Sequence, residues 1–196
     1  ASGSASVTVT QVASSVTLSP TSLSFMSLAD TATLTATVKD AGGTVISSPT
    51  VTWSSSDASV ATVSSAGLVT SVANGTATIT ATSGSASTTA SVTVAQAAST
   101  IEVSPSTSTL SSVGATVALT ATVNDAGGTA ISGATVAWAT SDASVATVSS
   151  AGLVTAVADG TATITATSGS LNATSAITVA QVASTVELSP TTLSLT

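Results

Sequence analysis

The sequence predicts an all-β protein built as tandem β-sandwich domains, and three observations predict this class. Apolar residues alternate with Thr and Ser along short segments, as they do in strands with one buried and one solvated face. Turn sequences that contain Gly or Asp follow these segments at short intervals. The whole pattern then recurs after 85 residues. We therefore expect an elongated array of similar domains, with about seven short strands in each.

The repeat sets the expected domain boundaries. Gln11, Gln96 and Gln181 are spaced by 85 residues, as are Pro20, Pro105 and Pro190, and Trp53 recurs as Trp138. The sequence GTATITATSG occurs at residues 75–84 and again at residues 160–169. These matches predict the end of a preceding repeat at 1–11, a first full repeat at 12–96, a second at 97–181 and the start of a following repeat at 182–196.

Strands are expected where the side chains alternate with period two. Residues 33–38 place Leu34, Ala36 and Val38 on one face, and residues 76–82 do the same with Ala77, Ile79 and Ala81. Val92 and Val94 share a face in residues 91–94. The intervening Thr residues and the β-branched Val and Ile suit a pleated, half-buried surface.

Turns are expected at three kinds of sequence, each of which occurs in both repeats. DAGG at 40–43 and 125–128 supplies Gly for a positive φ between two strands, and SSAG at 64–67 and 149–152 places Gly67 and Gly152 in a turn. Asn74-Gly75 and Asp159-Gly160 favour a type I′ β-hairpin.

The composition excludes several classes of function. The net charge is −7 at pH 7 and Lys39 is the only cation, whereas nucleic-acid binding needs a basic surface that neutralises phosphates. The chain lacks Cys and His, so it has no thiolate or imidazole ligands for a metal and no disulfide. The mean hydropathy is +0.63. No apolar run approaches the ~20 residues of a spanning helix, so we expect no membrane insertion by this segment.

One stretch of each repeat resembles a known family. Trp53 is followed by SSDASVATVSSAGLVTSVANGTATITATSG and then by SVTV, and the second repeat has a nearly identical stretch after Trp138. This order resembles the bacterial immunoglobulin-like domain of group 2, which is typified by the stalks of intimin- and invasin-like surface proteins. The resemblance covers both full repeats. It implies Ig-like β-sandwiches in tandem on bacterial surface proteins, or in some cases on phage virions, that space or present another module.

The aromatic and acidic residues of this stretch have two interpretations each. Trp53 and Trp138 are expected in the core as anchors of the sandwich, and the alternative is a platform that stacks on sugars. Asp57 and Asp142 are expected to accept backbone N–H groups in a turn, because a catalytic or metal-binding role needs a second acid nearby.

Other candidate sites are weaker. Calcium at the ends of the repeats would need six to eight oxygen ligands, and the candidates are Asn74, Glu102 and Asp125 in one group and Asp159 and Glu187 in another. We expect no metal site and no cofactor.

Catalysis and glycosylation also have limited support in the sequence. A Ser–Lys pair could use only Lys39, which Asn124 replaces in the second repeat, so we expect no enzyme activity. Asn74 and Asn172 lie in N-glycosylation sequons. The Ser/Thr-rich surface is compatible with O-linked sugars, and the Thr-rich faces are expected to be plain solvent faces rather than ice-binding surfaces.

The predicted function is structural. We expect a stalk, spacer or fibre element of a bacterial extracellular or cell-surface protein, with neighbouring repeats as its partners. Other copies of the chain are further candidate partners, because uncharged strand edges pair readily. The alternatives are an adhesive repeat that binds a glycan or receptor, and a domain that decorates a phage virion.

Overall fold

The computed structural model describes residue 4, residues 10–183, residues 185–187 and residue 189. Two compact units make up the chain. Unit 1 comprises Ala1–Ala97 together with Asp125–Thr129, and unit 2 comprises Ala98–Asn124 and Ala130–Thr196. The predicted pieces of further repeats, at 1–11 and 182–196, lie largely outside the described residues. The boundaries at 12–96 and 97–181 stay predictions.

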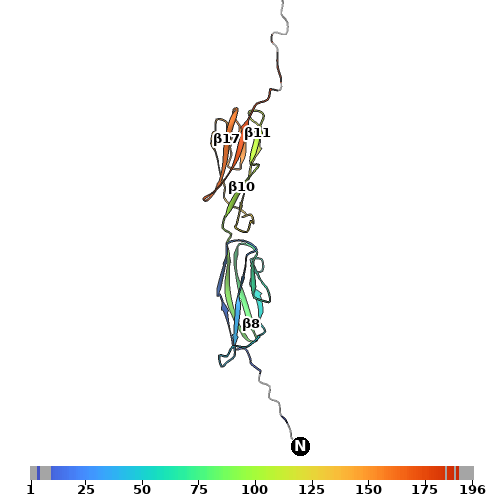
Figure 1. The fold of residues 1–196 in the computed structure, drawn as a ribbon, viewed down its shortest axis with the longest axis vertical. Coiled ribbons are helices and arrows are strands. Elements are labelled where there is room, and N and C mark those ends of the chain that lie inside the picture. Colours follow the sequence, from blue (N-terminus) through green and yellow to red (C-terminus); the bar gives the residue numbers. More distant parts are fainter. Residues whose placement is uncertain (1–3, 5–9, 184, 188, 190–196) are drawn as a thin grey trace, which may run out of the picture. The chain divides into compact units, whose positions relative to one another are not determined.

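The described residues form strands without helices, as Figure 1 shows for both units. No helix in this part of the chain is therefore long and apolar enough to cross a bilayer. The strands of unit 1 are β1 (Ser15–Ser19), β2 (Ser22–Phe25), β3 (Thr31–Thr33), β4 (Thr35–Lys39), β5 (Thr52–Ser55), β6 (Ala61–Val63), β7 (Leu68–Ser71), β8 (Gly75–Ser83) and β9 (Ala86–Val94). Those of unit 2 are β10 (Thr100–Ser104), β11 (Thr107–Leu110), β12 (Thr116–Ala118), β13 (Thr120–Asn124), β14 (Ala137–Thr140), β15 (Ala146–Val148), β16 (Leu153–Ala156), β17 (Gly160–Ser168) and β18 (Leu171–Val179).

Unit 1 is a two-layer sandwich. One layer has the order β2-β9-β8-β5, in which β2 runs parallel to β9 and the other neighbours are antiparallel. The other layer consists of β1-β4 and β3-β7-β6, and only Leu34 separates β3 from β4. β1 with β2, and β3 with β4, are thus two interrupted strands, and counting each pair once leaves seven strands. Unit 2 repeats this order as β11-β18-β17-β14, β10-β13 and β12-β16-β15, so the predicted all-β sandwich fold is confirmed.

The core lies where the alternation predicts it. Leu34 and Val38 of the interrupted strand are buried, and Ala77, Ile79 and Ala81 of β8 point inward with Val92 and Val94 of β9. The second repeat buries the matching residues Leu119, Val123, Ala162, Ile164 and Ala166. Each fully buried Val, Leu or Ile side chain contributes about 1.5–3 kcal/mol relative to its exposed state, and each Ala contributes less.

Two of the predicted turns form as expected. In DAGG, Gly43 has φ +82° and Lys39 pairs with Val45 across the turn, and Gly128 has φ +81° in the matching loop. In SSAG, the Ser64 N–H donates to the Leu68 carbonyl at 2.9 Å, which closes the hairpin between β6 and β7.

The predicted hairpin at Asn74-Gly75 is wrong, and so is the one at Asp159-Gly160. β7 and β8 lie in different layers, so this dipeptide connects the two sheets instead of closing a hairpin. Gly75 is needed there for space as well as for its φ of +148°, because a Cβ atom would lie 2.9 Å from Cγ2 of Val60. The hairpin of the larger sheet is instead closed between Ser83 and Ala86, with Gly84 at φ +59°.

Candidate functional site

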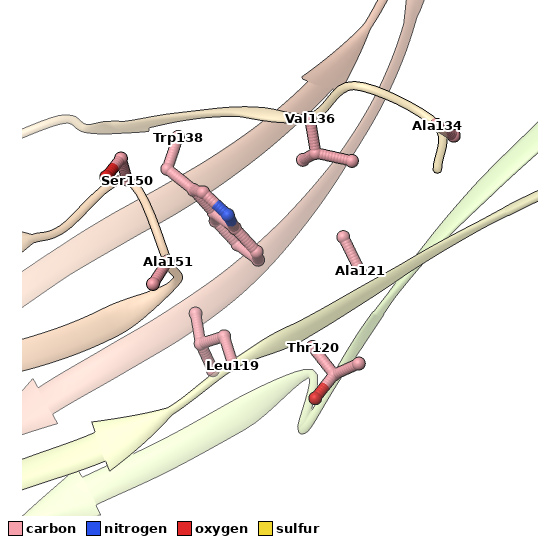
Figure 2. A pocket seen from close by; sticks show the side chains of 8 residues that line it. All are labelled: Leu119, Thr120, Ala121, Ala134, Val136, Trp138, Ser150 and Ala151. Atoms are coloured by element: carbon pink, nitrogen blue, oxygen red, sulfur yellow. The ribbon is translucent and has the colours of Figure 1, made fainter. Parts of the chain in front are cut away.

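A surface pocket beside the Trp residue occurs at the same place in both units. In unit 2 it has a volume of about 380 Å³, and in unit 1 of about 300 Å³. Figure 2 shows the Trp138 ring between the Ser150–Ala151 turn and the side chains of Leu119 and Ala121. The lining residues of unit 2 are Leu119, Thr120, Ala121, Ala134, Val136, Trp138, Ser150 and Ala151, and those of unit 1 include Leu34, Thr35, Ala36, Pro49, Val51, Trp53, Ser65 and Ala66 at matching positions.

Local chain geometry holds each Trp in place. Trp53 lies on β5, which is the edge strand of its four-stranded sheet. Gly67 has φ +81°, and an added Cβ atom would collide with the Leu34 carbonyl oxygen and lie 2.9 Å from Cζ2 of Trp53. Gly152 has the same relation to Leu119 and Trp138, at 2.5 Å and 3.0 Å. The SSAG turn therefore packs its backbone directly against the indole ring.

The two Trp side chains are less buried than the sequence predicts. Both pack against the hydrophobic cores, yet both are only half-buried. The reason is their position, because an edge strand leaves one side of the ring without a neighbouring strand. The exposed part of each ring lines the pocket.

Asp57 and Asp142 form local turns after the Trp strands. Oδ1 of Asp57 accepts the Ser59 hydroxyl at 2.5 Å and the Ser59 N–H at 2.9 Å. These two bonds hold the pKa of Asp57 below its ordinary value, and the hydroxyl group has the larger effect. Asp142 makes the same bonds with Ser144, at 2.6 Å and 2.9 Å, and its pKa is lowered for the same reason. These bonds have the pattern of Asx turns.

The sequon residues have different surroundings. Asn74 accepts the Gln96 N–H at 2.8 Å, and its Nδ2 donates to Oε1 of Gln96 at 3.2 Å. Asp159 takes the same place in unit 2 and accepts the Gln181 N–H at 2.9 Å. Asn172 is exposed on β18.

Among the described residues, no three His, Cys, Asp or Glu side chains lie close enough to hold a metal. Of the candidate calcium ligands, Asn74 and Asp125 both bond to the side chain of Gln96. Glu102 is exposed on β10, and Glu187 is exposed as well. Asp125 is buried, and it accepts from the Gln96 side chain at 2.8 Å and from the Leu28 N–H at 3.1 Å. The Gln96 amide is the main cause of the lowered pKa of Asp125. The sequence does not predict the contact between Gln96 and Asp125, and the even spacing of the Gln residues is the one feature of the sequence that points to a role for Gln96.

The outer face of the larger sheet in unit 1 carries only hydroxyl side chains. Pairing aligns them in rows across the strands, for example Thr89 with Thr80 and Thr80 with Ser54. The outward positions are Ser22, Ser24, Thr52, Ser54, Thr76, Thr78, Thr80, Thr82, Ser87, Thr89, Ser91 and Thr93. In unit 2, Ala137, Ala139, Asn172 and Ala176 interrupt the matching array.

The comparisons identify the family. The model of the bacterial Ig-like domain (group 2) matches residues 12–94 and again residues 97–179. The chain belongs to this family. A comparison with solved structures finds chains that are similar to this one, and a comparison with curated proteins finds no match.

Two of these structures are of a surface layer protein, and a third is of InvD. Domains 1–6 of the surface layer protein SbsC are 23% identical over 88% of this chain and 29% of that chain, with a TM-score of 0.44. SbsC domains 4 and 5 are 27% identical over 76% of this chain and 81% of that chain, with a TM-score of 0.42. InvD of Yersinia pseudotuberculosis is 21% identical over 89% of this chain and 60% of that chain, with a TM-score of 0.39. The chain thus spans less than a third of the length of the first of these structures.

Proposed function

We propose that this chain is a structural repeat segment of a bacterial extracellular or cell-surface protein, in which Ig-like domains act as a stalk or spacer. The observation that carries the proposal is the tandem repetition of one family domain, with matching residues in both cores. One domain is enough to carry a site for one ligand, whereas a long stalk needs several domains in series.

The surfaces of the domains support the same role. The outward side chains of the larger sheet in unit 1 are neutral hydroxyls, and only 5% of the residues of the chain are charged. Such a face is well solvated and offers few of the aromatic and Arg side chains that dominate binding energy at protein interfaces.

Small-angle scattering tests the proposal. Chains with two, three and four copies of the repeat should increase in maximum dimension by roughly 35–40 Å per copy, from strands of about 8 residues at ~3.3 Å each plus their loops. A maximum dimension that stays constant while the copy number doubles would refute the spacer role.

Lateral assembly is a second element of this proposal. β5 pairs only with β8 in the described residues, and its sequence TWSS has no charged residue. β14 has the same position in unit 2 with the sequence AWAT. Uncharged edges are open to pairing with another chain. Analytical ultracentrifugation should show association that Ser54→Lys and Ala139→Lys together abolish, and a monomer at all concentrations would contradict it.

Glycan binding is the second candidate function, and the Trp-lined pocket favours it because it occurs in both units. Oligosaccharide titrations should then change Trp fluorescence in both Trp53→Phe and Trp138→Phe chains. No change with a broad panel of neutral glycans would exclude this candidate.

A further inference from the structure

One end of unit 1 is covered by a short loop with the sequence DAGGT. The loop is Asp125–Thr129, which belongs to unit 1. Oδ2 of Asp125 accepts from Nε2 of Gln96 at 2.8 Å and from the Leu28 N–H at 3.1 Å, and only 1% of Asp125 is exposed. Both bonds are charge-assisted, which makes them stronger than neutral ones.

The backbone of the loop also lies close to this surface at Gly127. Cβ of an alanine at Gly127 would lie 3.5 Å from the Leu28 carbonyl oxygen and from Cβ of Ser27. The backbone of the loop thus approaches residues 27–28 closely, while its Asp125 carboxylate satisfies the Leu28 N–H.

The matching surface of unit 2 has the same backbone hydrogen bonds. The Val182 N–H donates to the Ser111 carbonyl at 3.1 Å, as the Ala97 N–H donates to the Met26 carbonyl at 2.9 Å in unit 1. Asp159 accepts the Gln181 N–H at 2.9 Å, as Asn74 accepts the Gln96 N–H at 2.8 Å.

The side chains on this surface of unit 2 face solvent. Val113 is 51% exposed and Val182 is 73% exposed, and Gln181 is exposed where Gln96 is half-buried. Val113 and Gln181 match Leu28 and Gln96, the two residues that bond to Asp125.

We propose that this surface of unit 2, formed by Val113, Gln181 and Val182, binds the DAGGT loop of a further copy of the repeat. The Val113 N–H and the Gln181 amide donate to the loop carboxylate, as their counterparts do in unit 1. This inference rests on the proposed function, because it names the contact through which the array continues. The loop contact can be disproved without disproving the spacer role, because a spacer can also extend through flexible joints.

One residue distinguishes the two surfaces and sharpens the proposal. Nδ2 of Asn74 donates to Oε1 of Gln96, which turns Nε2 of Gln96 toward the Asp125 carboxylate. Asp159 cannot donate this bond to Gln181, and its charge repels an incoming carboxylate. Asp159→Asn is therefore expected to strengthen binding of the loop.

Amide hydrogen exchange measured by NMR tests the proposal in two steps. In the present chain, Asp125→Ala should accelerate exchange of the Leu28 N–H by at least about tenfold, the equivalent of about 1.4 kcal/mol. Asp40→Ala is the matched control, because Asp40 is the same position one repeat earlier, and it should leave Leu28 unchanged.

The second step uses the chain extended after Val182 by another copy of residues 98–181. Exchange of the Val113 N–H should slow by about tenfold, slow further with Asp159→Asn, and return to the original rate when the Asp of the added loop is replaced by Ala. An unchanged Val113 rate in the folded, extended chain overturns the proposal.

A titration that does not depend on folding of the added copy provides the third measurement. A cyclised peptide with the sequence of residues 123–131 should shift the NMR signals of Val113 and Gln181 in the present chain, and leave those of Leu28 unshifted. The same peptide with Ala in place of Asp should shift neither. Equal shifts with both peptides, or none with the Asp159→Asn chain, overturn the proposal.

Discussion

A buried hydroxyl group on β7 contributes to holding the loop between β2 and β3 in unit 1. Oγ of Ser71 donates to the Ser27 carbonyl at 2.9 Å and lies 3.2 Å from the Asp30 carbonyl, and Ser71 and Ser27 are both buried. The Asp30 carbonyl also accepts the Ser71 N–H at 2.9 Å. Ser71→Ala therefore removes the hydroxyl partner of the buried Ser27 carbonyl, which should lower the free energy of unfolding of unit 1 by about 1–3 kcal/mol.

Unit 2 lacks this hydroxyl group, and Ser112, which matches Ser27, is exposed to solvent. Ala156 replaces Ser71, and the Ser112 carbonyl accepts the Ala115 N–H at 3.1 Å, in a turn where Gly114 has φ +80°. Unit 1 has Ala29 at φ +62° in that place, a conformation that strains any residue with a Cβ atom by about 1–2 kcal/mol. Gly relieves this strain but also adds conformational entropy to the unfolded chain, which offsets part of the gain. Ala29→Gly should therefore stabilise unit 1 by about 0.5–1 kcal/mol.

Urea unfolding followed by Trp fluorescence measures these effects. In a Trp138→Phe background, Trp53 is the one remaining indole and reports on unit 1. Ala156→Ser in unit 2 is the matched control and should not stabilise its unit. A Ser71→Ala loss below about 0.5 kcal/mol, or an equal gain from Ala156→Ser, would refute the reasoning, since a hydrogen bond to a buried carbonyl contributes more than that.

Three further predictions follow from the turns. Gly67→Ala should destabilise unit 1 by about 2–5 kcal/mol through both strain and collision, whereas Gly43→Ala, at φ +82° with open space around it, should cost about 1–2 kcal/mol; equal losses in calorimetry would contradict this. The pKa values of Asp40, Asp57, Asp125 and Asp142 are all lowered, mainly by the Thr44 N–H, the Ser59 hydroxyl, the Gln96 amide and the Ser144 hydroxyl in that order. A carboxylate with a lowered pKa stabilises the fold above its unfolded value of 3.8 and loses this contribution as the pH falls through the lowered value. Circular dichroism melts should thus give a constant midpoint from pH 7 to about pH 5 and a falling one below pH 4, and a midpoint that does not change down to pH 2 would argue against these bonds. Ser59→Ala should raise the pKa of Asp57 toward its ordinary value in an NMR titration while that of Asp142 stays unchanged in the same spectrum.

Residues that act through local periodicity were predictable from the sequence. The alternation identified Leu34, Val38 and Ile79 as buried, because side-chain direction in a strand depends only on residue parity. The turns at DAGG and SSAG were predictable for a similar reason, since each closes on strands immediately beside it.

Residues whose role depends on distant partners were not predictable in this way. The dipeptide Asn74-Gly75 has the composition of a hairpin turn, yet β7 and β8 pair with strands elsewhere in the sequence. The half-exposure of Trp53 follows from the edge position of β5, which no local pattern encodes. The bond between Gln96 and Asp125 joins residues that are 29 apart, and neither residue has a local motif that indicates the other.

The parallel pairing of β2 with β9 has a mechanical consequence. Ser22–Phe25 lies beside Ser91–Val94 in the same direction, near the start and the end of unit 1. Tension between these two ends pulls the paired strands in opposite directions along their length, so the hydrogen bonds between them are loaded in shear and must break together. A perpendicular load would open them one at a time at a far lower force. This pairing therefore resists a pulling force along the chain. β11 and β18 are paired in the same parallel way in unit 2.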